Sequence, residues 1–218
     1  MEEIRRQKEE CEGVIASLLP SLTAKRFQAA KLLAEALEQE LKDLMMPNAR
    51  FEIRLTKTEP FGAHGGEEVE FLFSANSGME PQPLHKIASG GEISRVNLAL
   101  KSVLRGIDPA CAFVFDEIDT GLSGRAAQKT GEKMYAIGQD SQVLCVTHLP
   151  QIAAMADWQI LVSKEETNGE TVTTVTPVEG AARVEEIARM IGGAEMTDLT
   201  LKNAAEILEL AMKQKTEC

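Results

Sequence analysis

The sequence lacks several features that would place it in a common class of protein. No apolar run approaches the roughly 20 residues that a membrane-spanning helix needs. No apolar segment follows the N-terminal stretch Met1–Arg6, so it does not read as a secretory signal. The four cysteines are scattered without Cys-x-x-Cys spacing, which argues against a zinc site or a disulfide framework and fits a reducing cytosol. At 218 residues the chain can form one sizeable core, or one domain with an appendage.

Positive charge is also scarce, because 23 Lys and Arg face 34 Asp and Glu, giving a net charge of −11. Nucleic-acid phosphates demand clustered cations, so the chain alone is not expected to bind DNA. A local basic face, on and just before the predicted helix 92–105, is the one candidate for contact with phosphates. The alternative is that the helix uses this face for packing. Its members are Lys86, Arg95, Lys101 and Arg105.

A small glycine-rich turn opens that helix. Ser89-Gly90-Gly91-Glu92 precedes apolar residues at helical spacing, namely Ile93, Val96, Leu100, Val103 and Leu104. Glycines let a backbone come close to a ligand, and the N-terminus of a helix favours a phosphate. Alternatively, Ser89 and Glu92 form a capping box that only satisfies the first backbone N–H groups. The turn alone does not decide between these two interpretations.

Two carboxylates follow a short apolar run. Ala112–Phe115 comes after a Gly106–Pro109 turn and is predicted to be a buried parallel strand, which Asp116 and Glu117 follow. The C-terminal ends of such strands line the ligand crevice of open α/β sheets. In P-loop ATPases one carboxylate here holds Mg²⁺ and a neighbour can act on the attacking water. An acidic turn without a catalytic role is the alternative.

A second apolar run, 142–147, is predicted to be another buried strand that carries His148 to the same edge. A lone histidine is more often a loop residue than a catalytic one, and its role depends on geometry. The turn at 89–92, the carboxylates after the first strand and His148 are all predicted at the same edge of the sheet. This coincidence favours a common site.

Together these segments resemble the ATP-binding-cassette ATPase heads of the SMC-like proteins. The residues within and around the motifs are similar to those of the RecN family of bacterial DNA repair proteins. The signature motif corresponds to Ser89–Glu92, the Walker B motif to 113–117, and the switch histidine to His148. Residues at the D-loop position are Asp119, Thr120, Gly121, Leu122 and Ser123.

The resemblance implies a role for each residue. Ser89, Gly90, Gly91 and Glu92 would contact ATP held by a second head, and Asp116 would hold Mg²⁺. Glu117 would be the general base or the group that positions the attacking water, and His148 would sense the γ-phosphate. The stretch 119–123 would communicate between the two sites of a homodimer. DNA would be bound through the full-length protein, in the cytoplasm and in association with the nucleoid, without a membrane partner.

One motif of such heads is missing. A Walker A loop reads Gly-x-x-x-x-Gly-Lys-Ser/Thr, and the sequence contains no Gly-Lys pair. The glycine-rich stretch 62–66 is followed by Glu67 where lysine is required. The resemblance therefore implies a C-terminal part whose partner is the N-terminal Walker A half, and the isolated chain is expected to hydrolyse little ATP. The alternatives are a non-catalytic dimerisation or docking module, and the head of another SMC-, Rad50- or RecF-like protein.

The predicted fold is α/β, with residues 1–46 as a helical coiled-coil root and 47–218 as the C-terminal half of the head. The root is predicted as two helices that break at Pro20, the second capped by Ser21 or Thr23. Its apolar seam also fits an amphipathic helix packed on its own domain; the seam comprises Phe27, Ala30, Ala34, Leu37, Leu41 and Leu44.

The rest of the chain is predicted as strands and helices around the motifs. A strand pair around 51–55 and 69–73 is predicted to be joined by a long, flexible turn at 62–66. Later elements are helices at 123–137 and 149–156, a hairpin turning at Asn168-Gly169, and helices at 184–191 and 199–213.

Overall fold

The computed structural model describes residues 1–87, 89–107, 110–167, 170–193 and 196–217. The chain divides into two compact units, Met1–Ala88 and Ser89–Cys218. The helical root and the strands that follow it lie in the same unit, whereas the predicted domain boundary after residue 46 stays a prediction. All the motif residues at 89–92, 116–123 and 148 belong to the second unit.

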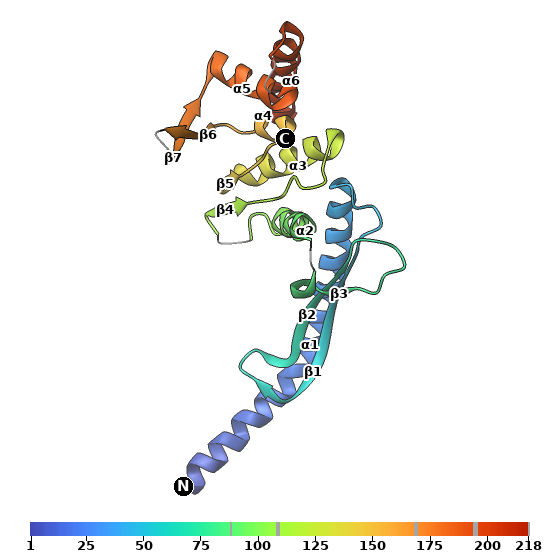
Figure 1. Ribbon diagram of the computed structural model, residues 1–218. Coiled ribbons are helices and arrows are strands. Elements are labelled where there is room, and N and C mark those ends of the chain that lie inside the picture. Colours follow the sequence, from blue (N-terminus) through green and yellow to red (C-terminus); the bar gives the residue numbers. More distant parts are fainter. Residues whose placement is uncertain (88, 108–109, 168–169, 194–195, 218) are drawn as a thin grey trace. The chain divides into compact units, whose positions relative to one another are not determined.

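The first unit is built on one continuous helix, α1 (Glu2–Asp43), with Pro20 inside it (Figure 1). The predicted break at Pro20 is therefore wrong, as is the cap at Ser21 or Thr23. A proline removes one helical hydrogen bond, but contacts on either side of it hold the helix. Leu19 lies beside Gly66 of the hairpin, and the Thr23 hydroxyl contacts Glu67 of the same hairpin.

A hairpin packs on α1. Strand β1 (Arg50–Gly62) pairs antiparallel with β2 (Gly65–Ser74), and β2 pairs with the short β3 (Gln82–Pro83), which leads to the 3₁₀ turn η1 (Leu84–Lys86). The predicted alternation matches this pairing, because Phe51 lies opposite Phe73 and Ile53 opposite Phe71. The core forms where the end of α1 lies on these strands, and its buried side chains include Leu37, Leu41, Leu44, Phe51, Leu72 and Phe73.

The tip of the hairpin is short, so the predicted long turn is wrong. Gly62 pairs with Gly65, and the tip is attached to α1 by long-range contacts. Arg26 donates to the His64 carbonyl at 2.6 Å and to the Glu67 carboxylate at 2.8 Å, while the Thr23 hydroxyl donates to the other Glu67 oxygen. These bonds, chiefly the one from Thr23, hold the pKa of the Glu67 carboxyl below its ordinary value.

The root seam is buried at its C-terminal end. Leu37, Leu41 and Leu44 lie in the chain's own core, as the amphipathic-helix interpretation expects, whereas Phe27 at the start of the seam is 61% exposed. The coiled-coil interpretation of the seam stays a prediction.

The second unit alternates helices with parallel strands, which confirms the α/β class. Helix α2 (Gly90–Val103) precedes β4 (Ala112–Phe115), and α3 (Gly124–Gly138) lies between β4 and β5 (Gln142–Cys145). The strands pair in parallel, with Val114 opposite Leu144. The turn predicted at 106–109 includes residues 108–109, which lie outside the described part of the chain.

The two-stranded sheet is covered on one face only, so the prediction that both strands are buried is wrong. Phe115 is buried, and Lys101 of α2 lies 4.9 Å from the centre of the Phe113 ring. The alternate residues face away: Val114 is 72% exposed and Leu144 is 49% exposed, and Val146 beyond β5 is exposed as well. Strands with Val or Leu on both faces are typical of parallel sheets that have a layer on each side.

The last elements pack around the short helix α4 (Pro150–Ala154). The hairpin of β6 (Gln159–Thr167) and β7 (Glu170–Val178) leads to helices α5 (Gly180–Gly192) and α6 (Asp198–Glu217). The hairpin is confirmed as antiparallel, whereas its predicted turn at Asn168-Gly169 lies outside the described residues. Among the described helices, none combines the length and apolar character that a membrane crossing requires.

Candidate functional site

The turn after β4 has an unusual backbone. Glu117 has φ +55°, in the left-handed region that residues other than glycine seldom occupy. The Asp116 carboxylate accepts the Glu117 N–H at 2.9 Å, and the Glu117 carbonyl accepts the Thr120 N–H at 3.2 Å. The two carboxylates follow the end of the strand, as predicted, and the tight turn leaves both exposed.

The glycine turn that opens α2 contains the predicted cap. Ser89 is the N-cap, and its hydroxyl accepts the Glu92 N–H at 3.4 Å. The cap accounts for one of the N–H groups that a helix leaves unpaired at its start, so it does not exclude an anion on the others. The second interpretation of this turn, as a phosphate site, stays a prediction.

The two turns lie directly against each other. A Cβ on Gly90 would clash with Oε2 of Glu117, and a Cβ on Gly91 would lie 3.0 Å from the Thr120 carbonyl oxygen. Only residues without a side chain allow this approach. One turn of the helix further on, the Ser94 hydroxyl donates to the Asp116 carbonyl at 3.0 Å. The structure therefore brings the predicted signature and Walker B segments together within one unit.

Arg95 also ties these turns together, a role that sequence reasoning did not find. Its Nη1 donates to the Thr120 carbonyl at 3.0 Å, and Nε is buried without a partner among the described residues. Burial lowers the pKa of the guanidinium, while Glu92 opposes that shift. The predicted basic face is thus used for packing: Arg95 bonds within the site, Lys101 lies over an aromatic ring and Arg105 pairs with Asp140.

His148 reaches the same site through Asp119. The Asp119 side chain is 5% exposed, and its Oδ2 accepts hydrogen bonds from the Thr147 hydroxyl at 2.7 Å and the His148 N–H at 2.8 Å. Nδ1 of the His148 ring lies 3.0 Å from the same oxygen. The ring itself is 76% exposed. This junction spans 29 residues of sequence, which explains why no local pattern indicated it.

The remaining D-loop residues complete the turn. The Leu122 N–H donates to the Asp119 carbonyl at 3.0 Å, and Gly121 has φ +74°. Ser123 is the N-cap of α3, although its side chain makes no cap hydrogen bond. Gly121, Leu122 and Ser123 thus shape the loop between β4 and α3, and their predicted communication between two sites stays a prediction.

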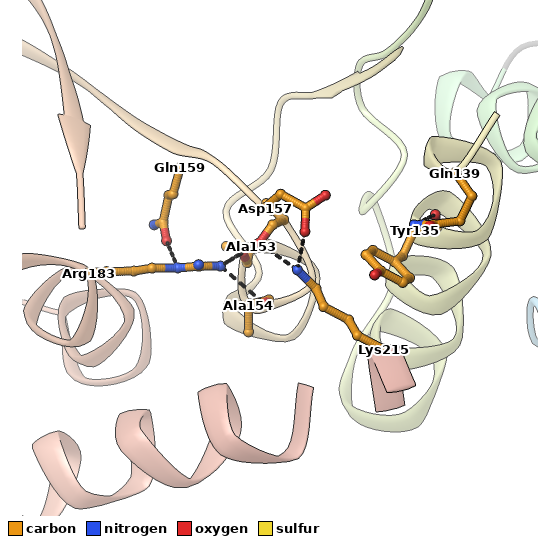
Figure 2. Close-up of polar contacts among 9 residues, drawn as sticks. Tyr135, Gln139, Ala153, Ala154, Asp157, Gln159, Arg183 and Lys215 are labelled. Carbon is orange, nitrogen blue, oxygen red and sulfur yellow. Dashed lines mark hydrogen bonds and ion pairs between the residues drawn. The ribbon is translucent and has the colours of Figure 1, made fainter. Parts of the chain in front are cut away.

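Two cations hold the helix that follows His148. Figure 2 shows Arg183 of α5 and Lys215 of α6 reaching the end of α4. Arg183 Nη2 donates to the carbonyls of Ala153, Ala154 and Ala156 at 3.3, 3.1 and 2.7 Å. Lys215 donates to the Ala156 carbonyl and the Asp157 carboxylate, and lies 4.8 Å from the Tyr135 ring centre. Cations at these carbonyls oppose the negative end of the helix dipole.

The chemistry of the site fits part of a magnesium–nucleotide site. Asp116 has one carboxylate oxygen engaged by the Glu117 N–H, which leaves the other for a metal-bound water. Mg²⁺ keeps several waters and is held by one or two carboxylates together with substrate phosphates. Among the described residues, no group of three or more His, Cys, Asp or Glu side chains is arranged to hold a metal alone. A phosphate would have to supply the missing ligands.

A thiol close to the site is unsuited to chemistry. Burial, with smaller contributions from Asp119 and Asp116, raises the pKa of Cys145 to about 12. The side chain therefore stays a neutral thiol, which is neither a nucleophile nor a metal ligand.

No model of a known protein family matches the chain. Among curated proteins, the DNA repair protein RecN of Halalkalibacterium halodurans is 46% identical over 199 residues, 89% of this chain. RecN of Bacillus subtilis is 43% identical over 202 residues, and RecN of Haemophilus influenzae is 42% identical over 191. The chain belongs to the RecN family. It spans 35%, 35% and 34% of the lengths of these three RecN proteins, so the predicted family and the prediction of a part of a longer protein are confirmed.

Solved structures agree on the fold of this RecN chain. The Smc head domain of Pyrococcus yayanosii with a coiled coil aligns with 97% of the chain and 35% of that protein, at a TM-score of 0.57 and 21% identity. The Smc head domain of Pyrococcus furiosus, bound to the C-terminal domain of ScpA, aligns with 97% of the chain and 45% of that protein, at a TM-score of 0.53 and 20% identity. The predicted SMC-type head fold with a helical root is thereby confirmed.

Proposed function

We propose that this chain supplies the C-terminal half of the ATPase site of a RecN-type DNA repair protein. The observation that carries the proposal is the junction of three separate segments in one unit. The glycine turn of α2 lies against Glu117 and Thr120, and the β4 turn binds the His148 segment through Asp119. Structural packing alone does not require exposed carboxylates and an exposed imidazole at such a junction.

The residues of the junction have complementary roles in this proposal. Asp116 holds a water of the Mg²⁺ ion, and Glu117 orients and deprotonates the attacking water. His148, in its protonated form, donates a hydrogen bond to the γ-phosphate from its outward nitrogen. When bound, Mg²⁺ neutralises charge on the β- and γ-phosphates. Ser89, Gly90 and Gly91 present helix N–H groups to the nucleotide of a second head, with Glu92 in the same first turn.

The site is incomplete without other chains or segments. The sequence has no Gly-Lys pair, so the phosphate-binding loop and its lysine come from another part of the parent protein. The chain spans about 35% of its relatives' length, which leaves room for that Walker A half. Positioning and charge stabilisation dominate phosphoryl transfer, so the isolated chain should turn over little ATP. Contact with DNA is expected through the whole protein.

The test is MgATP hydrolysis by a chimera in which this chain replaces the matching stretch of Bacillus subtilis RecN. We expect hydrolysis by the chimera and none by Glu117→Gln, which keeps the shape of the side chain but not its basicity. The Glu117→Gln chimera should still bind ATP and dimerise with it. The matched control is Asp140→Asn, whose carboxylate pairs with Arg105 outside the junction, and it should leave hydrolysis nearly unchanged.

Two results would count against this function. Robust hydrolysis by the isolated chain would show that the site is not divided between parts of the protein. A folded chimera that binds ATP but does not hydrolyse it, whether Glu117 is intact or substituted, would favour a non-catalytic role.

A second candidate is a docking module, and the bare face of the β4–β5 sheet favours it. Val114, Leu144 and Val146 expose an apolar stripe there. Light scattering of the chain at several concentrations would distinguish a defined dimer from heterogeneous association. A defined dimer that forms without ATP would support this module, whereas dimerisation that needs ATP and the Walker A half would support the ATPase.

A further inference from the structure

One oxygen of a buried carboxylate, Oδ2 of Asp119, accepts two hydrogen bonds from the His148 segment and lies 3.0 Å from Nδ1 of the His148 ring. We infer that Asp119 is a positioning residue, which fixes the orientation and the proton-bearing nitrogen of the His148 ring. The inference rests on the proposed function, in which His148 addresses a phosphate, and adds a role to a residue otherwise assigned to communication between two sites.

The geometry determines which ring nitrogen carries hydrogen. Nδ1 of His148 lies 3.0 Å from Asp119 Oδ2. Because a carboxylate accepts hydrogen bonds and donates none, this contact favours the form of the ring in which Nδ1 carries the proton. The outward nitrogen is then Nε2. A neutral ring accepts a bond there, and a protonated ring donates one to an anionic oxygen, while Asp119 holds the opposite nitrogen in both forms.

Burial explains why this contact matters for an exposed ring. The Asp119 carboxylate is 5% exposed, whereas the His148 side chain is 76% exposed. An exposed imidazole ordinarily samples several rotamers, and a bond to a fixed, buried partner removes that freedom. Positioning groups of this kind act through the residue that they orient.

The backbone contacts strengthen the anchor. The same Oδ2 accepts the Thr147 hydroxyl at 2.7 Å and the His148 N–H at 2.8 Å, and the Thr147 hydroxyl accepts the Leu149 N–H at 3.1 Å. Asp119 therefore fixes both the backbone that carries His148 and the ring itself. A purely structural role would use the first two bonds only, so the experiment must observe the ring.

The first measurement is the nitrogen-15 spectrum of the histidine rings in the full 218-residue chain, at a pH where the rings are neutral. The chain has three histidines, and the signal lost in His148→Ala assigns the ring of interest. We expect the Nδ1–H form of His148. Asp119→Ala should release the ring to a mixture of the two neutral forms, and Asp119→Asn, which keeps an acceptor oxygen, should restore Nδ1–H.

Matched variants separate the ring contact from the backbone contacts. Thr147→Val removes a hydroxyl bond but not the ring bond, so it should leave the ring in the Nδ1–H form. Asp140→Asn, in which the substituted carboxylate pairs with Arg105, should also leave the His148 signal unchanged. A wild-type ring in the Nε2–H form would overturn the inference even if Asp119→Ala did not fold.

The second measurement is a double-mutant cycle in the chimera. Asp119→Ala should lower MgATP hydrolysis about 10- to 100-fold when His148 is present, and about twofold or less when His148 is already alanine. If the fold-losses of hydrolysis in the two single variants multiplied fully in the double variant, Asp119 would not act through His148. An inactive wild-type chimera would contradict the proposed ATPase instead, and the ring spectra would still decide the role of Asp119.

Discussion

Gly90 and Glu117 lie so close that a methyl group on Gly90 would clash with the carboxylate oxygen Oε2 of Glu117. The two residues come from different elements and meet where a glycine turn faces a turn with a left-handed residue. The contact links the position of the carboxylate to the absence of a side chain on the facing helix.

The first prediction compares alanine at the two glycines. At Gly90 the added methyl meets the end of a flexible side chain, so Glu117 moves aside while the fold persists. At Gly91 it meets the Thr120 backbone at 3.0 Å, which cannot move as freely. We expect Gly91→Ala to lower the free energy of unfolding by about 1–3 kcal/mol. Gly90→Ala should change it little but should reduce hydrolysis by the chimera. Equal destabilisation by both would contradict this distinction.

A second prediction concerns the backbone of Glu117. Its φ of +55° costs a residue with a Cβ about 1–2 kcal/mol relative to glycine. Glu117→Gly and Glu117→Gln both remove the carboxylate, but only glycine relieves this strain. Because glycine is also freer in the unfolded chain, the net difference in unfolding free energy should be about 1 kcal/mol in favour of Glu117→Gly. Equal stability of the two variants in urea would show that the turn is not strained.

Arg183 is expected to stabilise the second unit. Its guanidinium donates to three carbonyls at the end of α4, and hydrogen bonds to charged groups are worth about 1.5–3 kcal/mol. Arg183→Ala should therefore lower the free energy of unfolding by about that amount. Trp158, the sole tryptophan, is already 78% exposed in the folded chain, so the transition is better followed by circular dichroism of the helices. Arg125→Ala, an exposed arginine on α3, should change stability by less than about 0.5 kcal/mol.

The hairpin tip should respond to acid. The hydrogen bond from Thr23, and to a smaller extent the contact with Arg26, lowers the pKa of Glu67 in the folded chain below its ordinary value of 4.5. Its contribution to stability is complete above that pH and is lost as the pH falls through the lower, folded pKa. Glu67→Gln should be less stable than the original chain at pH 7, and the difference should shrink on acidification below 4.5. Glu68→Gln, at the exposed neighbouring position, serves as the control in parallel acid titrations followed by circular dichroism.

Local signals in the sequence were sufficient for much of the fold and site. The parallel strands, the cap of Ser89 and the exposed carboxylates all follow from short patterns that a few neighbouring residues satisfy. Contacts between distant residues account for the errors. Leu19 and Thr23, on either side of Pro20, contact Gly66 and Glu67 of the hairpin, and these tertiary contacts outweigh the lost hydrogen bond.

The position of Asp119 shows the same limit within the site. Its sequence motif placed it in a loop, but its partner Thr147 lies 28 residues further along the chain. The bare face of β4 was missed for another reason. An apolar strand pattern indicates that both faces of the sheet are covered. It does not indicate whether the covering residues belong to the same chain segment or to another part of the protein.

That bare face makes the stability of the chain depend on its surroundings. A partner that covers Val114 and Leu144 binds the folded chain but not the unfolded chain, and therefore stabilises the fold by mass action. The gain in the free energy of unfolding grows with the logarithm of the ratio of the partner's concentration to its dissociation constant. The melting temperature of the chain alone is then a lower bound, which rises with partner concentration. Assembly and folding of this sheet are therefore coupled equilibria, and a titration of the melting temperature against a covering partner would yield the affinity of the interface.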